Sequence, residues 1–537
     1  MTGGPPSQMT HRQILVVFSG LMLGMFLAAL DQTIVATALP TIAGDFGQLD
    51  QLSWVVTAYL LTSTAASPLY GKLSDLFGRR RIFQAAIVIF LVGSTLAGMS
   101  QSMLQLIAFR AIQGVGAGGL IVMAITIIGD VLSPRQRGRY QGYMGSVFAL
   151  SSVAGPLLGG LFVDHASWRW VFYVNLPIGV VALVVTSSVL NLPFQRRQHR
   201  VDYLGAALLV AGVTALLLVT TWGGTTYAWT SPVIAGLTAA AVALLGLFVL
   251  QERRAAEPIL PLRLFRNRSF ALTSAIGWIV GLAMFGGIVY LPVFLQVVTG
   301  VEATNSGLLL VPLIGGLLAA SVSSGQIISR TGRYKIFPVV GTAVTALGLF
   351  LLSTMGASTS TLVAAAYMLV LGVGIGLTLQ VLVISVQNAV EQRDLGVATS
   401  LNLFFRSLGG AIGTAIFGAI VTAGVSHRVG DLVAGGAAVD VDRVTGSPTA
   451  ILNLPAAIRV PVVEAFADWI TTAFLVAAPL AVVALVLTLA LPELPLRQVA
   501  HVGAASPRSD SDSDSGSDSE EEVDSGLETT EALAFGS

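Results

Sequence analysis

The chain contains 537 residues, of which 54% are hydrophobic and 10% are charged, and its 28 basic and 28 acidic residues give a formal net charge of zero. This composition lacks the charged surface that an ordinary soluble domain needs. Cysteine is absent and the five histidines show no ligand spacing, so the sequence predicts no disulfide and no metal site. We therefore expect an integral membrane protein built from α-helices.

Apolar segments long enough to cross a bilayer recur along most of the chain. A spanning helix needs about 20 mostly apolar residues. Fourteen segments meet this requirement, and they cover residues 14–39, 52–71, 82–100, 104–130, 139–163, 169–191, 202–222, 232–250, 270–298, 304–328, 336–355, 361–387, 396–425 and 467–491. The predicted fold is therefore all-α, with fourteen transmembrane helices.

Basic residues gather in the loops that follow the even-numbered helices, and such residues tend to stay in the cytoplasm. These loops contain Lys72, Arg79, Arg80, Arg81, Arg135, Arg137, Arg139, Arg196, Arg197, Arg200, Arg253, Arg254, Arg263, Arg266, Arg268, Arg330, Arg333, Lys335 and Arg393. Both termini are therefore expected in the cytoplasm. The apolar run after Arg12 is too long for a cleaved signal and is interpreted as the first span.

Two stretches of the chain recur at one common offset. GKLSDLFGRRR, which begins at Gly71, returns as GQIISRTGRYK from Gly325, and GPLLGG from Gly155 aligns with GGAIGT from Gly409. Transporters are often built from related bundles. We therefore predict two equivalent six-helix bundles with two inserted helices between them.

The predicted organisation divides the chain into six regions. They are a cytoplasmic N-terminus (1–13), a first bundle (14–191), a linker with the inserted helices (192–250), a cytoplasmic loop (251–269), a second bundle with an external loop at 426–466 (270–491) and a cytoplasmic tail (492–537). The tail is rich in Ser, Asp and Glu, so it is expected to be disordered. A partner-binding or phosphorylated tail is the alternative.

The first apolar segment carries one acid, Asp31, in the motif LDQTIVATALP. A carboxylate near mid-membrane costs roughly 3 kcal/mol on insertion scales, so it must be neutralised, paired or hydrated. Arg110 in the fourth segment is expected within a few ångströms of the same depth, because each helical residue adds about 1.5 Å. Two interpretations stay open, namely a proton-coupling site or a permanent salt bridge that fixes helix packing.

The loop after the second helix combines turn residues with charges. Gly71 and Gly78 are expected to permit a tight turn, and Asp75 can cap a neighbouring helix. Asp130 ends the fourth helix, where the helix dipole disfavours an acid unless a cation is near, and the arginines of this loop are the predicted partners. The predicted gate or latch residues on the cytoplasmic side are Gly71, Asp75, Gly78, Arg79, Arg80 and Asp130.

The fifth helix contains the glycine-rich motif GPLLGG. Pro156 is expected to bend this helix, while Gly155, Gly159 and Gly160 let a neighbouring backbone approach closely. The predicted neighbour is the thirteenth helix or another helix at the interface between the halves.

Five motifs in chain order resemble those of the major facilitator superfamily, in particular its fourteen-helix drug:proton antiporters, the multidrug and quaternary-ammonium exporters. They are LDQTIVATALP, GKLSDLFGRRR, LIAFRAIQGVGAGG, GSVFALSSVAGPLLGG and WRWVFYVNLPIG. The resemblance covers residues 14–491 and implies the major facilitator fold, with a protonatable Asp31 tuned by Arg110. It also implies that the cytoplasmic motif latches an outward-facing state, and that GPLLGG is typical of exporters.

Arg406 is the other charge placed deep in a predicted span, and the sequence shows no partner for it. A cargo-binding role and a structural hydrogen-bonding role are both open. The residues that could line a central cavity, although such residues more often serve helix packing, are Tyr59, Gln113, Phe148, Tyr290, Phe294, Asn402 and Arg406.

The predicted function is proton-driven efflux of hydrophobic or amphipathic small molecules, cations among them, by alternating access. No enzymatic activity is expected, because the sequence shows no nucleotide loop, nucleophile triad or metal cluster. The expected partners are the lipid bilayer, the cargo and protons, with no cofactor, no nucleic acid and a monomeric state in a bacterial plasma membrane. Two alternatives stay open: a proton-coupled importer of the same fold, and a sensor or scaffold that acts through the acidic tail.

Overall fold

The computed structural model describes residues 11–47, 51–190, 202–224, 226–300, 309–434, 451 and 454–496. The helices of the first half are α1 (His11–Phe46), α2 (Leu52–Phe77), α3 (Arg79–Gly98), α4 (Met103–Val131), α5 (Pro134–His165), α6 (Trp170–Tyr173) and α7 (Asn175–Val189). The later helices are α8 (Tyr203–Trp222), α9 (Pro232–Glu252), η2 (Leu262–Arg266), α10 (Arg268–Val297), α12 (Val311–Thr331), α13 (Ile336–Ser353), α14 (Thr361–Ala389), η3 (Gln392–Asp394), α15 (Leu395–Ala434) and α18 (Ala456–Leu489). The predicted acidic tail from 497, most of the N-terminal segment and residues 191–201 lie outside the described residues.

Thirteen segments of the described chain are long and apolar enough to cross a membrane, against the fourteen predicted. The helix that falls short is α2, which has 26 residues but contains Pro68 and several hydroxyl side chains that lower its hydropathy. The all-helical membrane architecture is confirmed, whereas the exact count of fourteen is not.

The predicted sixth span is confirmed, since Trp170–Ser188 is long and apolar enough to cross a membrane although the helix is interrupted between α6 and α7. The predicted start of the tenth span at residue 304 lies outside the described residues, and α12 begins at Val311. One predicted boundary was wrong. The external loop predicted at 426–466 is shorter, because α15 continues to Ala434 and α18 starts at Ala456. The prediction ended these helices where charged residues begin. A helix that leaves the bilayer can continue in water, because its backbone groups remain paired within the helix.

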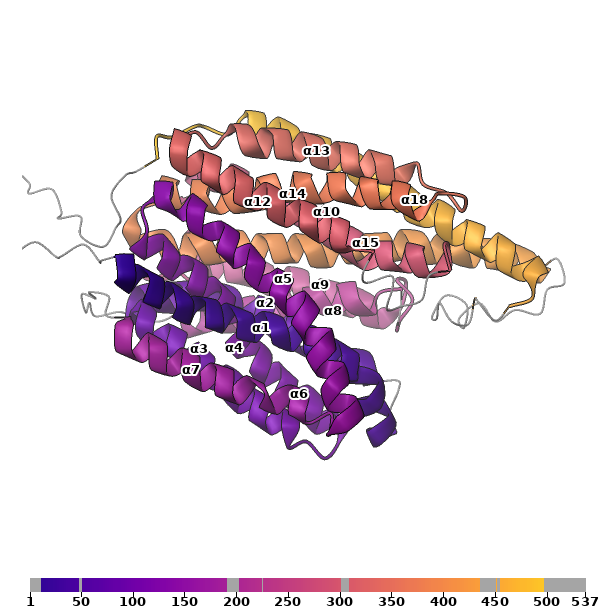
Figure 1. The fold of residues 1–537 in the computed structure, drawn as a ribbon, viewed down its shortest axis with the longest axis horizontal. Helices are drawn as coiled ribbons and strands as arrows, with labels where there is room; N and C mark the ends of the chain where they lie inside the picture. The colour runs from indigo at the N-terminus through magenta and orange to yellow at the C-terminus, as the bar shows by residue number, and fades with distance from the viewer. Residues whose placement is uncertain are drawn as a thin grey trace, which may run out of the picture.

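The helices form two bundles with matching contacts, as the internal repeat predicts. In the first half α1 packs on α5, α2 on α4 and α3 on α4, and in the second half α10 packs on α15, α12 on α14 and α13 on α14. The halves meet where α2 lies against α15 and where α5 lies against α12. Figure 1 shows that α1 begins and α18 ends at the same end of the molecule. We assign this end to the cytoplasm, since the arginine-rich loops predict that orientation.

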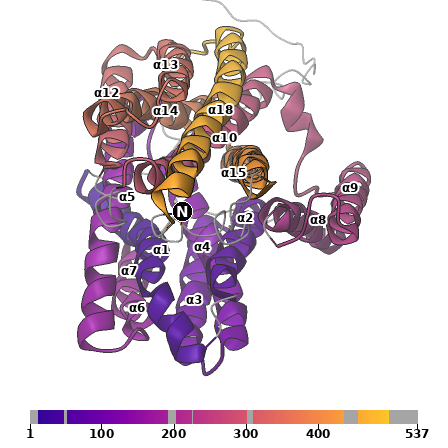
Figure 2. The same cartoon turned by 90° about the vertical axis from the view of Figure 1, so that its right-hand side faces the viewer.

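The inserted helices α8 and α9 pack against each other at the side of the two bundles. Figure 2 shows the pair next to α2 and α15, and α8 contacts both of these helices. Trp54 of α2 and Trp222 of α8 form an edge-on aromatic pair with ring centroids 5.1 Å apart. The insertion therefore adds a peripheral pair and leaves the two-bundle arrangement intact.

Glycines in the two equivalent central helices allow close backbone packing. A Cβ at Gly114 of α4 would lie 2.9 Å from the Cα of Tyr59 in α2. A Cβ at Gly372 of α14 would lie 2.8 Å from the carbonyl carbon of Leu313 in α12. Without a hydrophobic driving force between helices in lipid, such small residues let backbones make the contacts that hold the bundle together.

Gly372→Ala is expected to lower the free energy of unfolding by about 1–3 kcal/mol, because the added methyl group overpacks a backbone contact. The matched control is Gly315→Ala in α12, where a Cβ would meet nothing within 4 Å. We expect the control to be neutral or slightly stabilising, since alanine favours the helix. Thermal unfolding of the purified variants in one detergent measures the difference. A Gly372→Ala protein that melts with the native chain would contradict the packing argument.

Candidate functional site

A buried polar cluster surrounds Asp31 of α1. Arg110 Nη1 of α4 lies 2.5 Å from Asp31 Oδ2, and both side chains are at most 1% exposed. Asp31 Oδ1 accepts hydrogen bonds from Gln113 Nε2 at 2.8 Å and from Asn175 Nδ2 at 3.0 Å. The pairing of Asp31 with Arg110, predicted from their matching depths, is therefore present, and three donors converge on one carboxylate.

Arg110 makes several contacts in addition to its ion pair with Asp31. Its Nη1 donates to Gln113 Oε1 at 2.7 Å, and its Nε donates to the carbonyl oxygen of Val55 in α2 at 3.3 Å. The guanidinium carbon lies 4.2 Å from the ring centroid of Tyr59, whose hydroxyl donates to the carbonyl oxygen of Ala28 at 3.2 Å. The aromatic face stabilises the desolvated cation. Tyr59 and Gln113, predicted as cavity residues, are thus parts of the Asp31 cluster.

Asn175 is a member of this cluster that the sequence analysis missed. It is the first residue of α7, directly after the break that follows α6, and its side chain is fully buried. Its Nδ2 also donates to Ser94 Oγ of α3 at 3.0 Å, while its Oδ1 has no hydrogen-bond partner among the described residues. The motif WRWVFYVNLPIG contains this asparagine, but hydropathy gave no sign that it faces Asp31.

The cluster supplies the compensation that a buried carboxylate needs. A buried charge is costly unless it is paired and hydrogen-bonded, and Asp31 has one cation and two amide donors. These contacts tie α1 to α4 and α7.

A second cluster, the cytoplasmic latch, joins the two halves through Asp75, Arg79 and Asp130. Arg79 forms an ion pair with Asp75, and its Nε lies 2.7 Å from Asp130 Oδ2. Asp75 also accepts from the backbone N–H groups of Gly396 at 3.3 Å and Val397 at 3.0 Å, at the start of α15. These contacts bear out the expected helix capping by Asp75 and the expected arginine partner of Asp130.

One predicted latch role was wrong. Gly71 is not in a turn but inside α2, where a Cβ would lie 2.6 Å from the carbonyl oxygen of Gly396, so this glycine permits close approach of α15. Arg80 donates to the carbonyl oxygen of Ser187 in α7 at 2.6 Å. Gly78 does form the turn, with a positive φ of 93° that favours glycine.

A further contact between the halves was not predicted. Arg137 at the start of α5 is buried, and its Nη1 donates to Gln387 Oε1 of α14 at 2.9 Å. Gln387 Nε2 in turn contacts the carbonyl oxygen of Ile125 in α4 at 3.3 Å. From the sequence, Arg137 is only a marker of orientation, because its partner lies 250 residues away in the chain.

Two glycines of GPLLGG pack against α1 of the first half, which corrects the predicted contact with the thirteenth helix or another helix at the interface between the halves. A Cβ at Gly155 would lie 2.6 Å from Thr33 Cβ, and one at Gly159 would lie 2.9 Å from the carbonyl oxygen of Ile34, both in α1. A Cβ at Gly160 would meet nothing within 4 Å. The motif, with Pro156 inside the continuous α5, thus fits α5 against the helix that carries Asp31.

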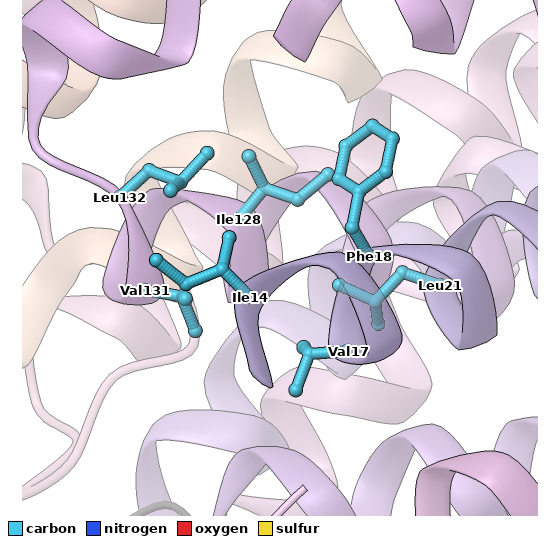
Figure 3. A pocket seen from close by; sticks show the side chains of 7 residues that line it. All are labelled: Ile14, Val17, Phe18, Leu21, Ile128, Val131 and Leu132. Carbon is cyan, nitrogen blue, oxygen red and sulfur yellow. The ribbon is translucent and has the colours of Figure 1, made fainter. Parts of the chain in front are cut away.

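The remaining predicted cavity residues do not gather at one place. Phe294 is fully buried in the core of the second half, Tyr290 packs beside Phe417, and Phe148 is 39% exposed. Asn402 and Arg406 lie one turn apart on α15. Figure 3 shows a small apolar pocket between the cytoplasmic ends of α1 and α4, and its lining of seven hydrophobic side chains offers no polar group to a cargo.

Comparisons with known proteins identify the family. Residues 21–414 match the model of the Major Facilitator Superfamily. The chain is 44% identical over 497 residues to an MFS-type transporter of Mycobacterium tuberculosis, covering 93% of this chain and 72% of that one. It is 40% identical to the multidrug transporter protein MdtP of Bacillus subtilis (76% and 75% covered) and 36% identical to multidrug resistance protein 3 of the same species (86% and 92% covered).

Solved structures show the same fold at low sequence identity. The human organic anion transporter MFSD10 superposes with a TM-score of 0.58 at 16% identity, covering 87% of this chain and 99% of that one. The proton:xylose symporter XylE gives 0.57 at 14% identity, covering 90% and 96%. The chain therefore belongs to the Major Facilitator Superfamily, as a multi-pass transporter of the plasma membrane and not an enzyme.

Proposed function

We propose that the protein is a proton-driven efflux antiporter that exports hydrophobic or amphipathic small molecules by alternating access. The observation that carries this proposal is the buried cluster of Asp31, Arg110, Gln113 and Asn175. An ionisable group inside a membrane span is by default a functional group, because its insertion is costly. The relatives named as multidrug proteins support export and a broad range of cargo.

The proposed cycle uses the two clusters in turn. With the cytoplasmic latch open, cargo enters from the cytoplasm while Asp31 is ionised. Closure of Asp75 and Arg79 on the start of α15 then commits the protein to the outward side, where a proton taken up by Asp31 accompanies cargo release. Proton and cargo must weaken each other's binding, because exchange is otherwise uncoupled.

Transport by purified protein in proteoliposomes tests the direction of coupling. With an acidic lumen and an alkaline exterior, an antiporter moves cargo into the lumen as protons leave. Ethidium is a suitable cationic probe because its charge does not change across this pH range. We expect ethidium to accumulate in the lumen, and the accumulation to vanish when nigericin collapses the pH gradient. Movement of ethidium out of the acidic lumen would instead show symport and overturn the proposal.

A further inference from the structure

Arg406 is a cation deep in the second half that lacks a counter-ion. It lies roughly 16 Å along α15 from the cytoplasmic end, at about 1.5 Å per residue. In the part of the chain that the structure describes, its guanidinium has neither an ion pair nor a hydrogen-bond acceptor, and the side chain is only partly exposed. A charge at this depth needs compensation. Asp31 and Arg110 already neutralise each other, so neither can supply it.

The face of α15 that carries Arg406 also carries Thr399, which is one hydrogen bond away from a contact between the halves. Thr399 precedes Arg406 by nearly two full helical turns and so lies on the same face. Thr399 Oγ1 accepts from Gln387 Nε2 at 3.2 Å, and the same nitrogen contacts the carbonyl oxygen of Ile125 in α4 of the first half. Alternating access places the cargo at this interface.

Two buried polar groups on α15 and α10 also lack partners among the described residues. Asn402 is 4% exposed and its Nδ2 donates to nothing, and Ser274 of α10 is 5% exposed with an unpaired Oγ. Helices α10 and α15 lie close together at Asn402 and Arg406. A Cβ at Gly277 of α10 would lie 3.8 Å from Asn402 Nδ2, and one at Gly281 would lie 3.2 Å from Arg406 Cγ. An unpaired buried donor costs free energy unless something binds it.

We propose that Arg406, Asn402 and Ser274 form a subsite for the carboxylate or sulfonate group of an amphipathic organic anion, which is one class of the cargo exported. The inference rests on the proposed antiport. All three residues can donate, and no carboxylate competes for them among the described residues. A guanidinium with neighbouring donors matches an oxyanion in charge and geometry. The same positive charge disfavours cations, so the subsite selects among cargoes.

An anionic cargo also changes the electrical balance of the cycle. Each proton that enters the cell moves one positive charge inward. An anion that leaves adds one to the net positive charge moved inward per cycle, whereas a cation that leaves reduces this net charge by one. For any fixed number of protons, an inside-negative membrane potential therefore speeds export of an anion more than export of a cation.

Paired probes in proteoliposomes test the subsite. We compare 8-anilinonaphthalene-1-sulfonate, a permanent amphipathic anion, with ethidium in the native chain, Arg406→Gln and Arg406→Lys. Arg406→Gln is expected to raise the KM for the anion at least tenfold and to lower the KM for ethidium, while Arg406→Lys keeps most of the anion transport. Asn402→Ala should raise the KM for the anion by a smaller factor. Arg393→Gln removes an exposed arginine of η3 and serves as the matched control.

The outcomes separate the subsite from the antiport itself. Uphill ethidium transport by the native chain without any transport of the sulfonate would overturn the subsite alone. Equal changes in KM for both probes in Arg406→Gln would also overturn the subsite. An arginine with only a structural role would not distinguish the two probes by their charge. Failure of both probes to respond to the pH gradient in the native chain would overturn the proposed antiport. A potassium diffusion potential that is positive in the lumen, set with valinomycin, should stimulate uptake of the sulfonate more than uptake of ethidium. The reverse order would also reject the subsite.

Discussion

Asp31→Asn is expected to abolish uphill export, so that cargo only equilibrates across the membrane. Asparagine has nearly the same shape as aspartate but takes up no proton in the working pH range. One pH unit is worth about 1.4 kcal/mol per proton, so exchange for one proton sustains about a tenfold cargo gradient. The variant should sustain none. Cargo accumulation in proteoliposomes under an imposed pH gradient gives the measurement, with release of protons on cargo addition to the purified protein as a second readout.

A double variant separates proton coupling from a purely structural salt bridge. Asp31→Asn alone leaves Arg110 buried without a counter-ion, which lowers the free energy of unfolding by about 3–5 kcal/mol. This loss of stability has nothing to do with proton coupling. Asp31→Asn with Arg110→Gln removes both charges and should recover most of that stability. If the pair is only structural, the double variant regains uphill export, and the proton-coupling role is rejected. The matched control is Asp45→Asn at the exposed external end of α1, where the new amide oxygen can still accept from Trp168 Nε1.

Gly71→Val is expected to reduce export at least about fivefold by preventing closure of the cytoplasmic latch. The new side chain would collide with Ser400 Oγ and with the carbonyl oxygen of Gly396, so α2 and α15 could no longer meet. Overpacking of this kind costs about 1–3 kcal/mol, which shifts an opening equilibrium roughly 5- to 150-fold. Initial rates of export from energised cells measure the loss.

Closure of the cytoplasmic latch can be measured directly by labelling an introduced cysteine, because the chain contains no cysteine of its own. Ala398 is fully buried at the start of α15, so Ala398→Cys should react slowly with N-ethylmaleimide while the latch is closed. Adding Gly71→Val should speed the labelling. Gly246→Val in α9, where a Cβ meets nothing within 4 Å, controls for the larger side chain. Equal labelling with and without Gly71→Val would show that Gly71 does not govern closure.

Much of this architecture follows from hydropathy and depth alone. A bilayer forces each span to satisfy its own backbone, so long apolar segments become helices wherever they occur. The internal repeat predicted the two bundles, and depth along the first and fourth helices predicted that Asp31 meets Arg110. Family motifs placed Asp75, Arg79 and Asp130 at one end of the bundle. These features are local in the sequence or fixed by distance along a helix axis.

The orientation of each helix about its own axis was decided only by the tertiary structure. In a membrane most spans are hydrophobic on every side, so no amphipathic pattern shows which residues face a partner helix. Asn175 therefore went unnoticed beside Asp31, Arg137 was not connected with Gln387, and the glycines of α5 were assigned to the wrong neighbour. The sequence by itself determined which helices exist and how deep each charge lies. Side-chain packing between distant segments decided which charges and donors meet.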